Sequence, residues 1–211
     1  MIDLHAHILH GLDDGPESAS ESMRMVQSYI NNGFATVAAT PHMVPGTAWM
    51  PSAERVTARV GDLNRAIRDR GLSLTVVSGM EIALDPAIPD LIDAGRLLPL
   101  GNTACLLVEP SFEQLPPGWE QTVFAILAKG YTVLLAHPER CRQLATDTDT
   151  LGRLVQSGVY LQVNWGSLLG QYGRTVADTA RTILKAGLAH CLATDSHHPG
   201  RPDLGRLSDA A

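Results

Sequence analysis

The sequence predicts an α/β fold in which seven parallel strands, each followed by a helical segment, close into a (β/α)7 barrel. Three observations support this prediction: seven short apolar or β-branched runs, segments of helical periodicity between them, and strand starts spaced by roughly 30 residues, the length of one strand–helix unit. An open sheet with helices on both faces is the alternative that the same pattern allows. Since no linker or low-complexity stretch interrupts the chain, we expect one domain over residues 1–211.

The predicted elements alternate regularly along the chain. Strands are expected at residues 2–7, 36–39, 74–81, 104–109, 132–136, 159–164 and 190–194. Helices are expected at residues 18–31, 53–70, 121–128, 149–157 and 176–186. A glycine follows each of these helices, where a left-handed C-cap is favoured; these glycines are Gly33, Gly71, Gly130, Gly158 and Gly187.

Composition and charge narrow the classes of function. The net charge is −6 and the pI is near 5.7, so the chain lacks the basic surface that a nucleic-acid partner requires. No apolar stretch is long enough to insert into a membrane, and the N-terminus does not resemble a secretory signal. The three cysteines form no CxxC pair, as is usual in a reducing compartment. We therefore expect a cytoplasmic protein.

Residues able to bind a metal follow the ends of the predicted strands. In a β/α barrel these positions converge on one rim, where barrel enzymes place their active sites. The two histidines of the opening His-x-His lie on the same face of a strand, because side chains alternate with period two. The candidate ligands are His5, His7, Asp14, His42, Glu81, Glu109, His137, Asp195 and His197.

This donor set indicates more than one divalent metal ion. Nitrogen and oxygen donors without thiolate suit manganese, iron or zinc and do not select strongly among them. Two divalent ions would neutralise the four carboxylates, and a third would leave a local positive charge able to attract a phosphate. Asp13 remains an alternative to Asp14 as the ligand. We interpret His10, His190 and His198 as structural residues. We interpret Trp49 and Tyr172 as loop packing, with the lining of a substrate pocket as the alternative.

Several motifs together resemble the polymerase-and-histidinol-phosphatase (PHP) superfamily, and within it the bacterial CpsB-type tyrosine phosphatases. The motifs are the opening Met-Ile-Asp-Leu-His-Ala-His, Asp13-Asp14-Gly15-Pro16, Ala136-His137-Pro138-Glu139-Arg140, Gln162-Val163-Asn164, and Asp195-Ser196-His197 ahead of Gly200-Arg201-Pro202. The resemblance implies a distorted seven-stranded barrel that holds three metal ions. It implies one ion on His5, His7, Glu81 and Asp195, a second on Glu81, Glu109 and His137, and a third on Asp14, His42 and His197.

The resemblance also implies an activity. Arg140 and Arg201 match the family's phosphate-binding arginines, and the reaction expected is hydrolysis of phosphotyrosine in a protein by a metal-activated water. Such an enzyme would act in the control of capsule or exopolysaccharide synthesis, with an autophosphorylating tyrosine kinase of polysaccharide export as a candidate partner. Manganese is the expected metal, with iron or zinc as alternatives.

Rival functions differ in the residues they require. A cysteine-based tyrosine phosphatase needs an arginine six residues after its cysteine, and none of the three cysteines has one. An amidohydrolase typically bridges its metals with a carboxylated lysine, but Lys129 and Lys185 both lie at predicted helix ends. Two alternatives stay open: a small-molecule phosphatase of the superfamily, for example one acting on histidinol phosphate, and a non-catalytic metal-bound interaction domain.

Overall fold

The structure of the protein, a computed structural model, describes residues 1–199. Its strands are β1 (Ile2–Ala6), β2 (Thr36–Ala39), β3 (His42–Met43), β4 (Thr75–Ser78), β5 (Glu81–Ala83), β6 (Cys105–Glu109), β7 (Thr132–Ala136), β8 (Tyr160–Asn164) and β9 (Cys191–Ala193). Its helices are α1 (Ala19–Asn31), α2 (Ala53–Asp69), α3 (Ile88–Asp93), α4 (Trp119–Ala128), α5 (Arg142–Ala145), α6 (Thr148–Gln156), α7 (Trp165–Leu168) and α8 (Arg174–Lys185), with a 3₁₀ turn η1 (Pro138–Arg140) after β7.

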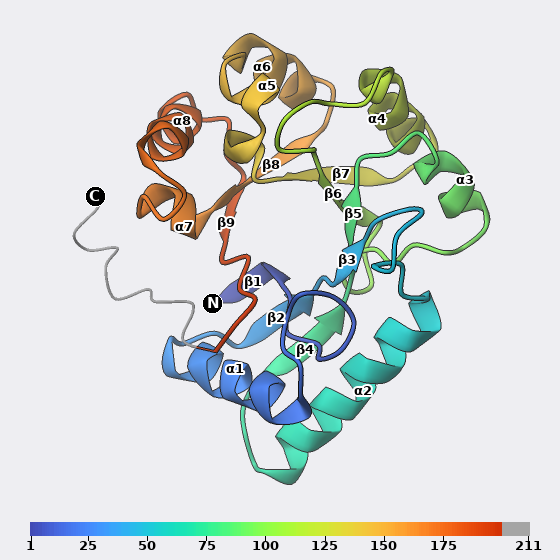
Figure 1. Ribbon diagram of the computed structural model, residues 1–211, viewed down its shortest axis with the longest axis vertical. Coiled ribbons are helices and arrows are strands. Elements are labelled where there is room, and N and C mark those ends of the chain that lie inside the picture. Colours follow the sequence, from blue (N-terminus) through green and yellow to red (C-terminus); the bar gives the residue numbers. More distant parts are fainter. Residues whose placement is uncertain (200–211) are drawn as a thin grey trace.

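The strands form two parallel sheets that join into one ring, with the helices outside it (Figure 1). One sheet has the order β1-β2-β4 and the other the order β3-β5-β6-β7-β8-β9. The ring closes where Ala6 pairs with Ser196 in parallel register, and the His7 N–H donates to the Ser196 carbonyl at 2.9 Å. The prediction of a parallel α/β barrel is confirmed, and the open-sheet alternative is wrong.

The predicted strand 74–81 is broken, and the short β3 follows β2 after a gap, so the barrel has two sheets. Thr40 and Pro41 separate β2 from β3, and a proline cannot donate a backbone hydrogen bond within a sheet. Gly79 and Met80 separate β4 from β5, and a Cβ on Gly79 would lie 2.8 Å from the side chain of Leu100. The predicted strand 74–81 is therefore two strands, and β3 was not predicted.

The five predicted helices all form, with bounds shifted by at most two residues. Helix α1 begins after Ser18, whose side chain accepts the backbone N–H of Glu21 at 3.3 Å. It ends before Gly33, which has a φ of 77° as a left-handed cap requires. The helices α3, α5 and α7 were not predicted, because segments of four to six residues give too few positions to show a helical period.

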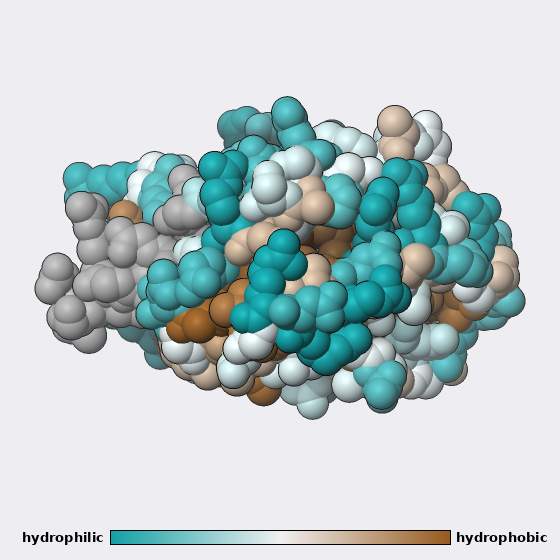
Figure 2. All heavy atoms as spheres, turned by 90° about the horizontal axis from the view of Figure 1, so that it is seen from below, coloured by the Kyte–Doolittle hydropathy of each residue, from teal (hydrophilic) through white to brown (hydrophobic). Residues whose placement is uncertain are grey.

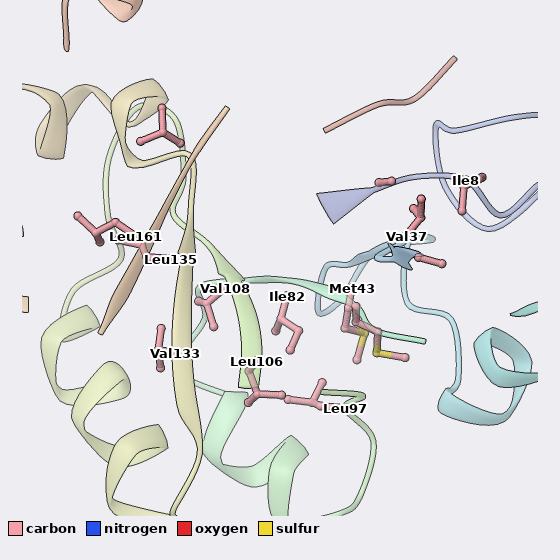
Figure 3. Packing of buried hydrophobic residues seen from close by; sticks show 14 of the residues in the cluster. Ile8, Val37, Met43, Ile82, Leu97, Leu106, Val108, Val133, Leu135 and Leu161 are labelled. Carbon is pink, nitrogen blue, oxygen red and sulfur yellow. The ribbon is translucent and has the colours of Figure 1, made fainter. Parts of the chain in front are cut away.

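The hydrophobic core has two layers that follow the alternation of side chains along the strands. On β6, Leu106 and Val108 belong to the cluster that the helices cover, whereas Leu107 packs inside the barrel beside Leu134 of β7. Figure 3 shows the residues of the larger cluster pointing from the strands toward the surrounding helices.

The surface on the side of α1 and α2 is mainly polar (Figure 2). Seen from the side on which α1 and α2 lie, hydrophilic residues cover most of the surface and leave small hydrophobic areas between them (Figure 2). Within residues 1–199, none of the helices combines the length and the apolar character that crossing a bilayer demands.

Candidate metal centre

All nine residues predicted as metal ligands lie together on one rim of the barrel. His5 lies in β1, His42 begins β3 and Glu81 begins β5, just beyond the ends of β2 and β4. Glu109 ends β6, and His137 directly follows β7. The others lie in the loops after β1 and β9: His7, Asp14, Asp195 and His197. Seven of the nine line a cavity of about 330 Å³: Asp14, His42, Glu81, Glu109, His137, Asp195 and His197.

A first group of donor atoms comes from four buried residues, His5, His7, Glu81 and Asp195. His5 Nε2 lies 3.1 Å from Glu81 Oε1 and 3.4 Å from Asp195 Oδ1. His7 Nε2 lies 3.1 Å from Glu81 Oε2 and 3.5 Å from Asp195 Oδ1. The two imidazole Nε2 atoms are 3.3 Å apart. Donors that each stand about 2.0–2.2 Å from one ion lie roughly 3.0–3.5 Å from one another, so these spacings fit a single small divalent cation.

A second group of donors surrounds the other side of Glu81. His137 Nε2 lies 3.0 Å from Glu81 Oε1 and 3.8 Å from Glu109 Oε1. His42 Nδ1 lies 3.0 Å from Glu81 Oε2 and 3.8 Å from Glu109 Oε2. The resemblance assigned Glu81, Glu109 and His137 to one ion. The structure groups Glu81 and Glu109 with His42, and His137 Nε2 lies beside them. Glu81 belongs to both groups, so its carboxylate is placed to bridge two ions.

A third group lies nearer the surface. Asp14 Oδ1 is 3.5 Å from His42 Nε2 and 3.4 Å from His197 Nε2. The His197 ring stacks on His7 with ring centroids 3.8 Å apart. These are the three residues that the resemblance assigned to a third ion, with His7 within reach as a fourth donor.

Asp13 and Asp14, which the sequence could not separate, occupy different places. Asp13 Oδ2 accepts hydrogen bonds from His7 Nδ1 at 2.7 Å and from the His42 N–H at 3.0 Å, and its Oδ1 accepts from the Gly15 N–H at 3.0 Å. Because the carboxylate can only accept, His7 carries its proton on Nδ1 and directs Nε2 toward the first group. Gly15 is required here, since a Cβ at this position would lie 2.5 Å from the His7 carbonyl oxygen.

The cluster contains buried polar atoms that a cation would satisfy. Among the described residues, Glu81 Oε2 and His42 Nδ1 are buried with no partner in hydrogen-bonding geometry, although they lie 3.0 Å apart. Buried polar atoms rarely stay unpaired in native proteins. The donors are imidazoles and carboxylates without thiolate, which suits manganese, iron or zinc. The residues present therefore fit bound divalent metal.

The pKa values of the buried histidines and carboxylates also indicate that this cluster needs added positive charge. Burial disfavours a charged His5, but the carboxylates of Glu81 and Asp195 raise the pKa of His5 to about 9. Burial likewise opposes ionisation of Asp195, but the neighbouring His5 lowers the pKa of Asp195 to about 2. Burial and the nearby charge on Glu81 raise the pKa of Glu109. A divalent ion would supply this positive charge and displace the imidazole protons.

Arg140 is held rigidly on the wall of the cavity. Its NH1 donates to Asp195 Oδ2 at 2.8 Å. The guanidinium lies between the rings of Phe112 and Tyr172, 4.4 Å and 4.2 Å from their centroids. Arg140 is thus placed beside the predicted metal ligands, as the sequence led us to expect. Arg201, the other predicted phosphate-binding arginine, lies outside the described residues.

Two exposed aromatic side chains line the same cavity. Trp49 stacks on His42 with ring centroids 5.1 Å apart and an interplanar angle of 11°, and Phe112 lines the cavity beside His137. The sequence favours loop packing for Trp49 and Tyr172 and indicates no role for Phe112, but Trp49 and Phe112 line the cavity. No sequence signal separates these aromatic residues from ordinary loop residues, because their positions depend on how the loops fold over the rim.

Backbone strain within residues 1–199 coincides with two of the predicted ligands. His137 has a φ of 28° and Asp195 a φ of 51°, and they are the non-glycine residues with positive φ in this part of the chain. Such conformations cost about 1–3 kcal/mol and persist where the surrounding structure enforces them. At Asp195 the closing strand pair enforces it, since the Asp195 N–H donates to the His5 carbonyl at 3.0 Å.

Comparisons with known proteins agree with this geometry. Residues 1–207 match the sequence profile of a family described as "Capsular polysaccharide synthesis, CpsB/CapC". Tyrosine-protein phosphatase YwqE of Bacillus subtilis is 33% identical over 199 residues, which cover 94% of this chain and 78% of YwqE.

Solved structures show the same fold. One comes from a study of YwqE from Bacillus subtilis and CpsB from Streptococcus pneumoniae, described as unique metal-dependent tyrosine phosphatases. The comparison of that structure with this chain gives a TM-score of 0.89 at 31% identity, and it covers 95% of this chain and 81% of the solved chain. A putative histidinol phosphatase from Listeria monocytogenes shares the fold at 12% identity, with a TM-score of 0.61 and coverage of 99% of both chains. Because the profile spans nearly all of the sequence and YwqE shares a third of its residues, the chain belongs to the CpsB/CapC family, with a fold of the PHP type.

Proposed function

We propose that this chain is a metal-dependent tyrosine-protein phosphatase, linked to capsular polysaccharide synthesis, that hydrolyses phosphotyrosine in a protein substrate. Membership of the CpsB/CapC family supports the activity, since YwqE is a tyrosine-protein phosphatase at 33% identity. The observation from the structure that carries the proposal is the position of Glu81. Its buried carboxylate is shared by two groups of histidine donors at the cavity, and Arg140 lies on the wall of that cavity.

We propose that three divalent ions bind at this rim. His5, His7, Glu81 and Asp195 would hold the first, Glu81, Glu109 and His137 the second, and Asp14, His42 and His197 the third. Manganese is the metal we expect, with iron and zinc as the alternatives that this donor set accepts. When bound, the ions neutralise the carboxylates, attract the phosphate group and acidify the water that attacks it.

The arginines of the chain would bind the phosphate. The planar fork of a guanidinium matches two phosphate oxygens, and charge develops on these oxygens in the transition state. Arg140 is suited to this role because Phe112, Tyr172 and Asp195 fix it before substrate arrives. Arg201 would be the second phosphate-binding arginine, by its match to the family motif. The leaving group of phosphotyrosine is a phenol with a pKa of about 10, which leaves more readily than an aliphatic alcohol.

We further propose that residues 1–211 form a single phosphoesterase domain in the cytoplasm. The continuous core under the helices supports the single domain. The absence of a disulfide among Cys105, Cys141 and Cys191 supports a reducing compartment. A phosphotyrosine protein is the substrate, and an autophosphorylating tyrosine kinase of polysaccharide export is the partner that we propose. Nucleic acid is not expected to bind, because the chain carries a net charge of −6.

A comparison of substrates tests the proposed function. The purified, manganese-loaded protein is assayed for phosphate release from a phosphotyrosine peptide, histidinol phosphate and a generic aryl phosphate. We expect the phosphotyrosine peptide to give the highest kcat/KM and the His5→Ala variant to release little phosphate from any of the three. Rapid cleavage of histidinol phosphate without cleavage of phosphotyrosine would assign the protein to the small-molecule phosphatases instead. Metal binding without any turnover would indicate a non-catalytic domain.

A further inference from the structure

We propose that Gln162 and Asn164, on β8, are positioning residues that orient two of the proposed metal ligands, His5 and Asp195. The inference rests on the metal site of the proposed function. Both amide side chains are fully buried, in a barrel whose interior is otherwise largely apolar. They are two residues apart on one strand, so they lie on the same face. A buried amide is costly unless it is hydrogen-bonded, and this pair is bonded to the metal site rather than to the rest of the core.

The two amides form a continuous chain of hydrogen bonds from one ligand to the other. Gln162 Oε1 lies 3.0 Å from His5 Nδ1. Gln162 Nε2 donates to Asn164 Oδ1 at 2.7 Å. Asn164 Nδ2 donates to Asp195 Oδ2 at 2.7 Å. We call this chain, from His5 through Gln162 and Asn164 to Asp195, the amide relay.

The direction of the amide relay is fixed by its carboxylate end. Asp195 can only accept, so Asn164 must present its NH₂ group to it and its carbonyl oxygen to Gln162. Gln162 must then present its own NH₂ group to Asn164 and its carbonyl oxygen to His5. That oxygen can only accept, so His5 must carry a proton on Nδ1. The lone pair of His5 is therefore on Nε2, the atom that lies 3.1 Å from Glu81 Oε1.

The relay also determines which oxygen of Asp195 can bind a metal. Asp195 Oδ2 accepts from Asn164 Nδ2 and, at 2.8 Å, from Arg140 NH1. Its Oδ1 faces His5 Nε2 at 3.4 Å and His7 Nε2 at 3.5 Å. Two donors occupy one oxygen and leave the other directed at the first group. Asp195 would therefore offer Oδ1 as its ligand atom.

A buried carboxylate holds the far end of the relay in place. Glu139 Oε1 accepts the backbone N–H of Asn164 at 2.8 Å and the Ser167 hydroxyl at 2.7 Å. The backbone of Asn164 is thereby fixed as β8 passes into α7. Because the backbone of Asn164 is fixed, its amide has little freedom to leave Asp195.

A measurement on the wild-type protein tests the direction of the hydrogen bonds in the amide relay. In the Zn²⁺-loaded chain, ¹⁵N NMR of the His5 ring is expected to show a protonated, exchange-protected Nδ1 and a metal-bound Nε2. A metal-bound Nδ1 would overturn the proposal. This measurement needs no variant, so it remains decisive if substitutions on β8 prevent folding.

Variants test the effect on metal binding. Gln162→Met and Asn164→Leu keep the size of each side chain and remove its hydrogen bonds. For each we expect the affinity for one Zn²⁺ per chain, measured by competition with a chromophoric chelator, to fall about 10- to 100-fold, as for other residues that orient metal ligands. Asn64→Leu is the matched control, because Asn64 is an amide that bonds to the backbone of Val76, at 2.7 Å and 2.9 Å, away from the metal ligands.

The results for these variants and for the wild-type protein distinguish a failure of the amide relay from a failure of the proposed function. If Gln162→Met and Asn164→Leu lower the melting temperature as Asn64→Leu does but keep wild-type Zn²⁺ affinity, the two residues are structural only and the proposal is wrong. If their Zn²⁺ affinity falls while the wild-type protein fails to hydrolyse phosphotyrosine, the relay stands and the proposed activity does not.

Discussion

Replacing Glu81 by glutamine is expected to have the largest effect of any single substitution in the protein. The Glu81 carboxylate lies within 3.1 Å of four imidazole nitrogens, those of His5, His7, His42 and His137. Glutamine keeps the shape but removes the negative charge, and its NH₂ group would face nitrogens that need a cation or an acceptor. Loss of a residue that only orients a ligand costs about 10- to 100-fold, so loss of a bridging ligand should lower kcat/KM by more than about 100-fold and reduce the number of ions bound.

Metal content and phosphatase activity, both measured on one sample of Glu81→Gln, test this expectation. Elemental analysis should find fewer ions per chain in Glu81→Gln than in the wild type, with turnover of a phosphotyrosine peptide reduced in parallel. Glu113→Gln is the control, because the Glu113 side chain is 80% exposed and pairs with Arg142 on the surface at 3.7 Å. Wild-type metal content and turnover in Glu81→Gln would contradict the assignment of Glu81 as the bridging ligand.

Replacing Arg140 by alanine is expected to lower turnover while leaving the metals bound. The guanidinium contacts Asp195 through Oδ2, the oxygen that faces away from the first group of donors, so its removal spares the metal ligands themselves. A donor that binds transition-state charge contributes about 10²- to 10³-fold to kcat, and we expect a loss of this size with a phosphotyrosine peptide. Arg140→Lys should restore little, because lysine cannot provide a planar fork or stack between Phe112 and Tyr172.

The steady-state parameters and the metal content of the variant distinguish this role from a structural one. Arg142→Ala is the matched control: it is two residues away, its side chain is 82% exposed, and its ion pair is with Glu113 on the surface. Full turnover in Arg140→Ala would refute a role in phosphate binding. Loss of metal together with turnover would show that Arg140 acts through Asp195 and not on the phosphate.

The sequence predicted which histidines and carboxylates lie together on the rim because topology determines it. Strand ends of a parallel barrel meet on one rim, so His5, Glu109 and His137 could be placed together without any knowledge of contacts. The same reasoning gave the seven strand regions and the five longer helices. It could not predict β3, which Thr40 and Pro41 separate from β2, or the break between β4 and β5 at Gly79, where Leu100 approaches closely.

The interactions that orient the cluster were not predictable, because they join residues distant in sequence. The bond between His5 and Gln162 spans 157 residues, and nothing in a Gln-x-Asn pattern indicates its partner. The separate places of Asp13 and Asp14 likewise depend on the fold of one loop around the His7 carbonyl. Trp49 and Phe112 line the cavity only because their loops fold over the rim.

Titration of the metal-free protein with Mn²⁺ tests the central claim most directly. Phosphate release from a phosphotyrosine peptide and the melting temperature are followed as the ion is added, and bound ions are counted by elemental analysis. The account predicts negligible release without metal, a rise in release as up to three ions bind per chain, and a parallel rise in melting temperature as the buried carboxylates gain counter-charge. Full release of phosphate in the presence of a chelator, with no ion bound, would contradict it.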